Sequence, residues 1–339
     1  MKISIFGSGA WGTAIALLLH DNGNDVTLWS KFEQEADILR NTRENPLLKG
    51  VAIPQEILVT SDINKAAKDA AAAVMAVPSY AVRETAAALC RLIEPGCIVI
   101  CVSKGIEKDT SSLFTKILKE IFGAHVPVVS VSGPTHAEEV AKRIPSGCVA
   151  ASDDAEAADL VQELMLNDYF RVYTSSDIVG VELGAALKNV IALCAGVCDG
   201  LGFGDNTAAM LMTRGLAEMA ELCVKMGGRK ETIAGLAGLG DLIVTCISRH
   251  SRNRSAGVLI GKGMSVSEAM REVGATVEGY YAAKAAWELS LLTGADMPIC
   301  SEAYKVLYEG KDALSAMRDL MRRTKKSEHD LGEEAWVTR

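Results

Sequence analysis

A short apolar strand, a glycine turn and a helix follow one another at the beginning of the sequence. Residues 3–6 are mostly apolar and β-branched, and the segment after the turn has the apolar spacing of a helix. In the turn, Gly7 permits a tight bend, Gly9 lets backbone N–H groups approach a pyrophosphate, and Gly12 lets the helix pack against the strand. The helix would present free N–H groups and its positive dipole end to the phosphates. A second apolar strand at residues 26–29 completes the pattern, which predicts a dinucleotide-binding unit rather than an ordinary turn.

Strand and helix patterns alternate through the rest of the first half of the chain. The expected strands cover residues 72–77, 97–102, 126–131, 148–151 and 170–173, and the expected helices cover residues 81–92, 111–122 and 155–166. Continuous apolar strands separated by helices predict a doubly wound, mostly parallel sheet covered on both faces. Ligands bind at the carboxyl ends of the strands in such sheets. That edge is expected to hold Ser79, Lys104 and the segment 133–135.

The second half of the chain has a different character. The strand pattern stops near residue 177, and long alanine- and leucine-rich helical patterns follow at residues 181–200, 206–226, 265–273, 279–292 and 301–309. The chain is therefore expected to be an α/β protein with two domains. These are a Rossmann-type NAD(P)-binding domain at residues 1–177 and an all-helical substrate-binding and catalytic domain at residues 178–339. Residues 322–326 are expected to form a charged, frayed tail.

Composition narrows the class of function. With 339 residues, 49% of them apolar and 23% charged, the chain is expected to be an ordinary globular protein. Its net charge of −8 argues against general nucleic-acid binding, and its apolar runs fall short of the roughly 18 residues of a membrane span. No basic-then-apolar leader precedes the first strand, so a cytoplasmic location is expected. The nine cysteines lie mostly in apolar stretches without metal-ligand spacing, which predicts buried reduced thiols and no metal site.

Two polar residues interrupt the first apolar helix of the second half. Lys188 and Asn189 lie within residues 183–193, which would otherwise form a buried helix. A buried lysine has a lowered pKa and can transfer protons near neutral pH. The alternative is a lysine whose ammonium group reaches solvent. Asp241 follows a glycine-rich turn at an expected helix N-cap, with Thr245 one turn later, and capping alone is the alternative for Asp241.

A compact group of polar side chains follows at residues 250–254. Arg252 offers a planar fork to a phosphate, and Ser251 and Asn253 add neutral donors. These residues are candidates for an anion site, with a solvated basic surface as the alternative.

Seven segments together carry a resemblance to a known family. They are GSGAWG (7–12), VSKGIE (102–107), SGPT (132–135), KNVIA (188–192), TRGLAE (213–218), GLGDL (238–242) and SRNR (251–254). In this order the chain resembles the bacterial-type NAD(P)-dependent glycerol-3-phosphate dehydrogenases, from Lys2 to about Glu309. No single motif decides the resemblance, but seven in register are specific.

The resemblance implies a role for each matching residue. Lys188 would accept the proton when glycerol 3-phosphate is oxidised and return it when dihydroxyacetone phosphate is reduced. Lys104 would lie near both cofactor and substrate, and Asp241 and Thr245 would orient Lys188. The expected substrate contacts are Lys104, Gly133, Thr135, Lys188, Asp241, Ser251, Arg252 and Asn253. The expected cofactor contacts are Gly7, Gly9, Ala10, Trp11, Gly12, Ser30, Lys31, Lys104, Ala137, Arg252, Thr276 and Glu278.

Three positions depart from the family pattern. Ala10 stands where serine is common, so backbone N–H groups must suffice for the pyrophosphate there. His136 stands where phenylalanine is usual and is expected to fill that space rather than to act as a base. Thr276 stands where valine is frequent, a near-isosteric change.

The cofactor is expected to be NADP or NAD, with NADPH favoured. An acidic residue after the second strand normally holds the ribose 2′-OH of NAD and repels the 2′-phosphate of NADP. In this chain Ser30 and Lys31 follow that strand, and the first carboxylate is that of Glu33.

The expected reaction is reversible hydride transfer between NAD(P)H and dihydroxyacetone phosphate, giving sn-glycerol 3-phosphate for glycerophospholipid synthesis without a metal. The nearest enzymatic alternatives are 6-phosphogluconate dehydrogenases, hydroxy-acid dehydrogenases and ketopantoate reductases, and the segment 251–254 favours a small phosphorylated substrate over theirs. A nucleotide-sensing protein would not need Lys104, Lys188 and Asp241 together. A homodimer is one option for the assembly, and neither a nucleic-acid partner nor a membrane span is expected.

Overall fold

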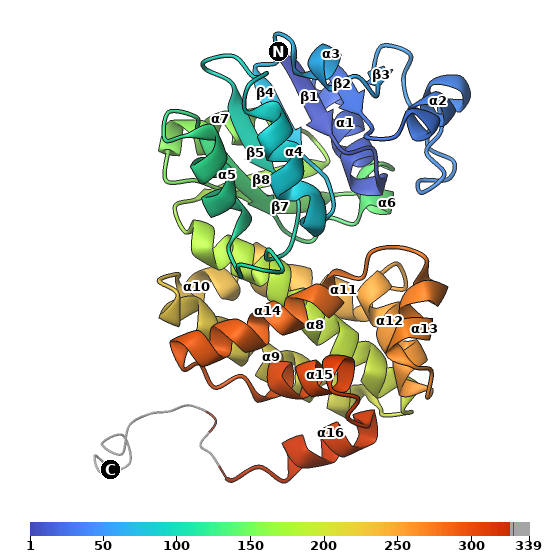
Figure 1. Cartoon of the computed structure of the whole chain (residues 1–339), viewed down its shortest axis with the longest axis vertical. Coiled ribbons are helices and arrows are strands. Elements are labelled where there is room, and N and C mark those ends of the chain that lie inside the picture. Colours follow the sequence, from blue (N-terminus) through green and yellow to red (C-terminus); the bar gives the residue numbers. More distant parts are fainter. Residues whose placement is uncertain (326–327, 329–339) are drawn as a thin grey trace.

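A sheet-containing part of the chain precedes a helical part in the computed structural model (Figure 1). The structure describes residues 1–325 and 328, so Lys326 of the expected tail and the end of the second expected domain lie outside the described residues. The strands are β1 (Lys2–Phe6), β2 (Asp25–Trp29), β3 (Leu58–Thr60), β4 (Ala72–Met75), β5 (Ile98–Cys101), β6 (Val128–Ser132), β7 (Ser146–Ala151) and β8 (Phe170–Ser175). The predicted fold class is confirmed.

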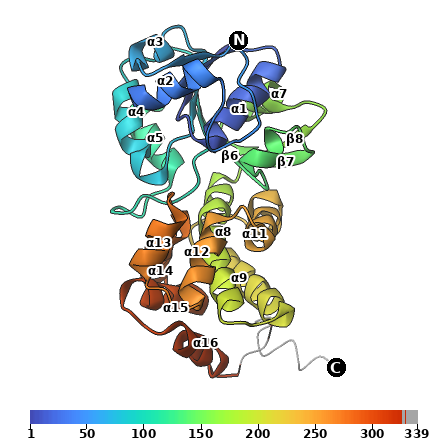
Figure 2. The same ribbon diagram turned by 90° about the vertical axis from the view of Figure 1, so that its right-hand side faces the viewer.

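The eight strands form one sheet in the order β3-β2-β1-β4-β5-β6-β7-β8. All neighbouring strands are parallel except β6 and β7, which pair antiparallel. The carboxyl ends of β1, β2, β4, β5 and β6 therefore meet at one edge. This edge faces the helical part of the molecule (Figure 2).

Side chains alternate between two hydrophobic layers along each central strand, as the period of two requires. On β1, Ile3 and Ile5 belong to the layer on the α1 and α7 side, whereas Phe6 belongs to the layer on the α4 and α5 side. The helices of this part are α1 (Ala10–Asp21), α2 (Glu33–Thr42), α3 (Ile63–Ala67), α4 (Val82–Leu89), α5 (Phe114–Phe122), α6 (Ala137–Val140) and α7 (Ala155–Met165). Both faces of the sheet are covered, as predicted.

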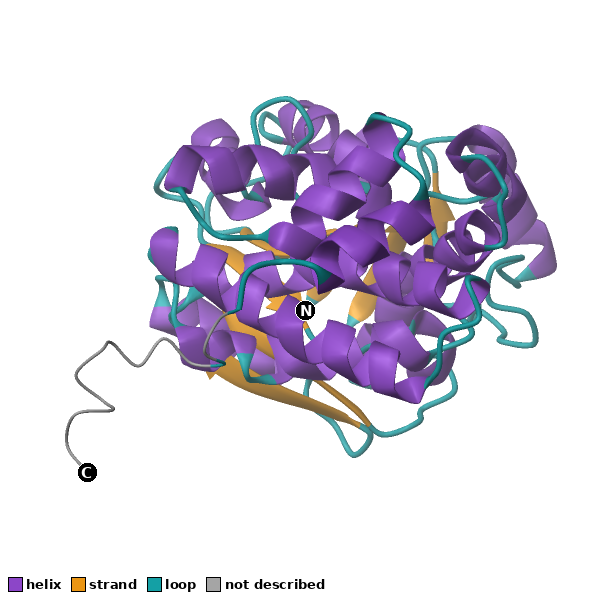
Figure 3. Ribbon diagram, turned by 90° about the horizontal axis from the view of Figure 1, so that it is seen from below, coloured by secondary structure: helices purple, strands orange, loops and turns teal. Residues whose placement is uncertain are grey.

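The helical part is built around α8 (Ile178–Gly200), which is buried along most of its length. The other elements are α9 (Asp205–Lys225), α10 (Lys230–Ile233), a π-helical turn η2 (Leu236–Gly240), α11 (Asp241–Ile247), α12 (Arg252–Gly261), α13 (Val266–Val273), α14 (Glu278–Thr293), α15 (Pro298–Tyr308) and α16 (Ala313–Met321). By length and composition α8 could cross a membrane, but 83% of its apolar window is buried inside the protein, as in the core helix of a globular protein. Seen from below, which is the side of the helical part in Figure 1, helices lie in front of the sheet (Figure 3).

A buried carboxylate joins the two parts of the molecule. Glu182 on α8 accepts hydrogen bonds from the backbone N–H of Thr115 on α5 (3.0 Å) and from its hydroxyl (2.6 Å). Burial raises the pKa of Glu182 to about 7, and the bonds from Thr115 oppose this shift. The carboxyl group thus satisfies a free N–H in the first turn of α5 from across the junction.

The nine cysteines are free thiols in the structure, and seven of them are buried. The prediction that they behave as small apolar side chains is confirmed for those seven.

Candidate active site

Two lysines and one aspartate form a buried cluster where the sheet part meets the helical part. Lys104 follows β5, Lys188 lies in the middle of α8, and Asp241 is the first residue of α11. Lys104 Nζ donates to Asp241 Oδ2 (2.8 Å), and Lys188 Nζ donates to Asp241 Oδ1 (2.9 Å). The side chains are only 17%, 7% and 2% exposed in that order. The expectation that the three residues lie together is met, and a solvent-reaching Lys188 is ruled out.

Close backbone packing sets the position of Asp241 opposite Lys188. A Cβ on Gly184 would lie 2.6 Å from the carbonyl oxygen of Ala237, so the glycine lets α8 touch the π-helical turn η2. Lys188 is one turn further along α8, on the same face. The turn η2 ends at Gly240, which is the N-cap of α11. The prediction that Asp241 is itself the N-cap is wrong, because it is the first helical residue and its carboxylate binds the two lysines instead.

The hydrogen-bond partners of Lys188 leave one of its donors for a ligand. Its Nζ also donates to the hydroxyl oxygen of Thr245 (2.8 Å), and that hydroxyl donates to the carbonyl oxygen of Asp241 (2.6 Å). Because the single Thr245 proton is used in this way, the threonine oxygen faces Lys188 as an acceptor. An ammonium group has three N–H donors, and within the part of the chain that the structure describes Lys188 has these two partners. The third is available to substrate.

Lys104 is bound more completely. Besides Asp241, its Nζ donates to the carbonyl oxygen of Gly133 (2.9 Å) and contacts the hydroxyl of Thr135 at 3.5 Å. Gly133 and Thr135 follow β6, and Ala137 begins α6. The structure thus brings the loops after β5 and β6 together with α8 and α11, as the sequence predicted.

Burial and charge act on the cluster in opposite directions. Burial lowers the pKa of Lys188 to about 8, an effect that Asp241 opposes and Lys104 reinforces. Burial alone would raise the pKa of Asp241, but the two lysines hold it below its usual value. Asp241 therefore stays ionised, and the amine of Lys188 can exchange a proton near neutral pH.

His136 lies beside this cluster as the N-cap residue of α6. Burial lowers its pKa, and the charge of Lys188 lowers it further. Its Nε2 is buried and has no hydrogen-bond partner among the described residues. These observations favour a neutral ring that occupies space, in line with the expectation for this position.

The expected phosphate-binding residues lie at the start of α12. Ser251 is its N-cap and accepts from the backbone N–H of Arg254 (3.2 Å). Arg252 is exposed, and its charge acts on Glu278. Asn253 is buried; it donates to the side chain of Asn189 (2.8 Å). The segment is therefore adjacent to Lys188 through Asn189, with Arg252 as its exposed cation.

Asn253 has a second partner that the sequence did not predict. Its Oδ1 accepts from the backbone N–H of Gly279 on α14 (2.8 Å). Its side-chain amide thus joins α12 to α8 and α14, in addition to any contact with a ligand.

The glycine turn after β1 has the form that a dinucleotide requires. Gly7 has φ +122°, a conformation that favours glycine, and a Cβ on Gly12 would lie 1.9 Å from the carbonyl oxygen of Gly7. A Cβ on Gly9 would project into open space. No side chain caps α1, and no acidic residue lies in its first turn, which begins at Ala10. The free backbone N–H groups at the start of α1 therefore fit a pyrophosphate, although Ala10 lacks the hydroxyl that is common at this position.

Trp11 donates from its indole N–H to the carbonyl oxygen of Val102 (3.2 Å), and this bond joins α1 to the end of β5.

The carboxylate next to Ser30 is that of Glu35, which no pattern in the sequence indicated. Ser30, the first residue after β2, donates to Glu35 Oε2 (2.9 Å). Glu33 instead binds Arg40 and Ser61. Lys31 is exposed and paired with Glu84 (2.7 Å). The helix α2, which begins at Glu33, was not predicted, so the direction of Glu35 had no signal in the sequence.

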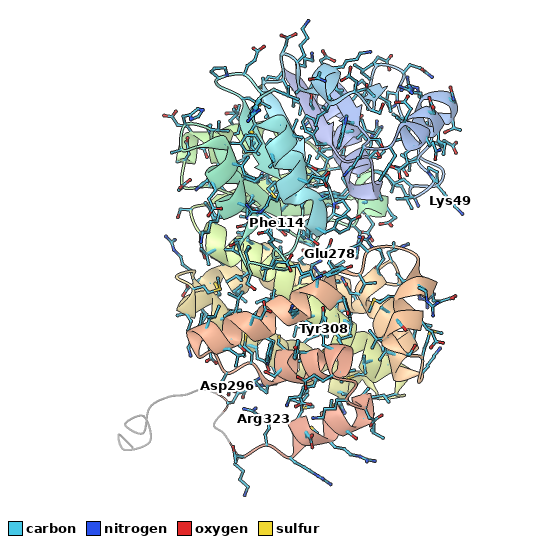
Figure 4. The ribbon with its side chains drawn as sticks, viewed as in Figure 1. Lys49, Phe114, Glu278, Asp296, Tyr308 and Arg323 are labelled. Atoms are coloured by element: carbon cyan, nitrogen blue, oxygen red, sulfur yellow. The ribbon has the colours of Figure 1, made fainter. Side chains whose placement is uncertain are left out.

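Glu278, the first residue of α14, reaches from the helical part to the sheet part (Figure 4). Its Oε1 accepts from the backbone N–H of Ser79 after β4 (3.2 Å). Burial raises the pKa of Glu278, and the bonds from Ser79 oppose that shift. Thr276 lies two residues earlier, half-buried in the loop before α14. The pair Glu278–Ser79 thus links the helical part to the sheet part near Arg252.

Metal ligation has no support in this region. Within residues 1–325 and 328, no group of three or more His, Cys, Asp or Glu side chains could hold a metal ion.

Comparison with known proteins gives one family for both halves of the chain. Residues 2–158 match the N-terminal part, and residues 177–318 the C-terminal part, of the family described as NAD-dependent glycerol-3-phosphate dehydrogenase. A relative from Thermoanaerobacter sp. (strain X514), named glycerol-3-phosphate dehydrogenase (NAD(P)+), is 48% identical over 328 residues, which cover 97% of this chain and 99% of that protein. A relative of the same name from Desulfitobacterium hafniense (strain Y51) is 46% identical over 99% of this chain and 95% of its own length. The crystal structure of a glycerol-3-phosphate dehydrogenase from Coxiella burnetii has a TM-score of 0.92 at 34% identity, covering 95% of this chain and 99% of that one.

Proposed function

Because this chain belongs to the NAD-dependent glycerol-3-phosphate dehydrogenase family, we propose that Lys188 is the group that moves the proton in its reaction. The enzyme interconverts dihydroxyacetone phosphate and glycerol 3-phosphate, with NAD(P) as the redox partner. The observation that carries the assignment is the one remaining donor of Lys188, held in a buried cluster by Asp241 and Thr245.

Each member of the cluster has a distinct task in this proposal. A bound nicotinamide dinucleotide supplies or accepts the hydride at C2 of the substrate. In the reducing direction, Lys188 Nζ gives a proton to the alkoxide that develops from the carbonyl oxygen. In the oxidising direction, the neutral amine accepts the proton of the hydroxyl group. Lys104 adds positive charge opposite the developing alkoxide, so no metal ion is needed for this purpose.

Arg252 is proposed to hold the phosphate of the substrate, with Ser251 and Asn253 beside it. Its exposed guanidinium, close to the cluster through Asn253 and Asn189, supports this assignment. Gly133 and Thr135 are proposed to contact the substrate from the loop after β6. Residues 1–177 are proposed to form the dinucleotide-binding domain and residues 178–339 the substrate domain, whose last residues lie outside the described part of the chain.

The cofactor is proposed to be NADPH or NADH, with NADPH favoured. The turn 7–12, Ser30, Lys31, Ala137, Thr276 and Glu278 are the proposed contacts. The open N-terminus of α1 and the hydroxyl and cation after β2 support this proposal. We further propose that the enzyme works in the cytoplasm, as a homodimer, and that its product enters glycerophospholipid synthesis.

The decisive experiment compares substrates side by side. Oxidation of NADH and of NADPH is followed with dihydroxyacetone phosphate, pyruvate, ketopantoate and glyoxylate. Rapid turnover is expected with dihydroxyacetone phosphate alone. Preferred turnover of an acid substrate would instead point to a hydroxy-acid dehydrogenase or a ketopantoate reductase.

A further inference from the structure

One carboxylate oxygen lies between the first and second strands at the edge where a dinucleotide binds. Glu35 Oε2 accepts from the hydroxyl of Ser30 at 2.9 Å and, in a longer contact, from the hydroxyl of Ser8 at 3.5 Å. Ser8 belongs to the glycine turn after β1, and Ser30 is the first residue after β2. The two strands are adjacent and parallel, so the carboxylate of Glu35 bridges their carboxyl ends.

This is the place that the adenosine ribose occupies in a Rossmann-type unit. The pyrophosphate lies at the N-terminus of the first helix, and the ribose extends from there across the end of the second strand. In this chain the first helix begins at Ala10 without a side-chain cap. A ribose placed from that end meets Ser30 and the carboxylate that Ser30 holds.

The other charged side chains nearby have different partners. Glu33 binds Arg40 and Ser61. Lys31 Nζ lies 2.7 Å from Glu84, in a pair whose side chains are 50% and 70% exposed. Exposed pairs of this kind contribute little to stability, so Lys31 is free to exchange Glu84 for another anion.

We propose that Glu35 sets the balance between NADH and NADPH, by accepting a hydrogen bond from the ribose 2′-OH and repelling a 2′-phosphate. The proposal rests on the proposed function only in taking a nicotinamide dinucleotide as the ligand. Lys31 is the opposing group, which can pair with the 2′-phosphate once it leaves Glu84. The chain thus has Glu35 to favour NADH and Lys31 to favour NADPH, and Glu35 is the residue that allows NADH to be used.

Dissociation constants test the proposal without reference to turnover. They are measured for NADH, NADPH, 5′-ADP and 2′,5′-ADP by calorimetry, with wild type, Glu35→Gln, Glu35→Ala and the matched control Glu33→Gln. The amide of Glu35→Gln can still accept from the 2′-OH but carries no charge. We expect this variant to bind NADPH and 2′,5′-ADP on the order of fivefold more tightly, as for loss of one repulsion of about 1 kcal/mol at 4 Å in water. Its affinity for NADH should change by less than about twofold.

The remaining variants separate the two effects of Glu35. Glu35→Ala should also weaken NADH binding, by about three- to tenfold, because the 2′-OH then has no side-chain acceptor at this position. Glu33→Gln removes the same charge from the same helix and should leave the ratio of the two constants unchanged. The gain in NADPH affinity should fall as salt is raised, because the repulsion is screened.

Either of two results would overturn the proposal. One is an unchanged NADPH-to-NADH ratio in Glu35→Gln, and the other is an equal change in Glu33→Gln, which would mean that only net charge matters. A wild type that binds both dinucleotides but does not reduce dihydroxyacetone phosphate would contradict the proposed function alone, since the ratio of constants would still decide the role of Glu35.

Discussion

Lys104 and Lys188 bind opposite oxygens of one carboxylate, at 2.8 Å from Asp241 Oδ2 and 2.9 Å from Asp241 Oδ1. Two cations share one anion in a site with little access to water, so the cluster has a surplus of positive charge. A surplus of this sign stabilises an alkoxide more than a neutral carbonyl group, which is the condition for catalysis by preorganised charge.

Replacing Lys188 by methionine should lower turnover by about 10²- to 10⁴-fold, the usual contribution of a general acid–base group. Binding of NADPH, followed by its fluorescence, should change little, because the lysine acts on the substrate. The pKa of Lys188 is about 8. In the wild type, the rate of glycerol 3-phosphate oxidation should therefore rise as pH passes through this value, and the rate of dihydroxyacetone phosphate reduction should fall. Both limbs should be missing in the variant. Near-normal turnover of Lys188→Met would mean that another residue transfers the proton, with Lys104 as the first candidate and His136 as the second.

Replacing Asp241 by asparagine should move the pH profile. The carboxylate raises the pKa of Lys188 against the effect of burial, so its loss should shift the rising limb of glycerol 3-phosphate oxidation to lower pH. The variant leaves two buried cations without their anion, and a stability loss of roughly 3–5 kcal/mol is expected. Rates at several pH values and the thermal midpoint test the two effects separately. An unchanged pH limb would show that Asp241 does not control Lys188.

Replacing Arg252 by alanine should lower kcat/KM by an amount that corresponds to about 2–4 kcal/mol of lost transition-state binding, as for a lost charge-assisted contact with a phosphate. Lysine at this position should recover only part of the loss, because a point charge does not reproduce the guanidinium fork. Unphosphorylated dihydroxyacetone should be a very poor substrate of the wild type. If it reacts nearly as well as its phosphate, the phosphate site lies elsewhere.

Replacing Lys31 by glutamate should shift the ratio of kcat/KM values towards NADH. The substitution removes the cation proposed to meet the 2′-phosphate and puts an acid directly after Ser30. The wild type should use NADPH at least as well as NADH. Exclusive use of NADH by the wild type would contradict the proposed preference.

Replacing Glu182 by glutamine should remove a pH dependence of stability. The folded state raises the pKa of this carboxyl group from 4.5 to about 7, so the folded protein holds the proton more tightly than the unfolded chain. Its contribution is therefore fully present below about pH 4.5 and is lost as pH rises through about 7. The loss is on the order of 3 kcal/mol. Thermal midpoints at pH 5 and pH 8 should differ less in Glu182→Gln than in the wild type, and an equal difference in both would assign the pH dependence to other groups.

Most of the fold could be predicted because its central strands β4, β5 and β6 are fully buried and its main helices are long. The apolar runs around β4, β5 and β6 predicted buried strands of one sheet, and the change to helices was predicted directly after β8. The three-residue strand β3 and the short helix α3 carry too few residues for a periodic signal. The antiparallel return of β7 was not visible either, since strand direction depends on the path of the connection and not on composition.

The residue types of the candidate site could be predicted, and the family resemblance also implied that Asp241 and Thr245 lie beside Lys188, but the remaining contacts could not be predicted. Lys188 stood out as a charge in an apolar helix, and Asp241 followed a glycine-rich segment. That both lysines share Asp241 depends on the packing of α8 against η2, which sequence spacing does not specify. Ser79 was expected at this edge of the sheet, but its contact with Glu278 joins residues 199 positions apart in the sequence, and no local pattern predicts such a pair.

Asn253 limits how the substrate range of this enzyme can change. Its side-chain amide donates to Asn189 and accepts from Gly279, so it fastens α12 to two other helices while standing next to Arg252. A substitution of Asn253 would remove the hydrogen bonds that join these helices and so destabilise the fold. A substitution of the exposed Arg252 would change substrate recognition with little loss of stability. Laboratory evolution towards a new substrate should therefore accumulate changes at Arg252 early and leave Asn253 untouched.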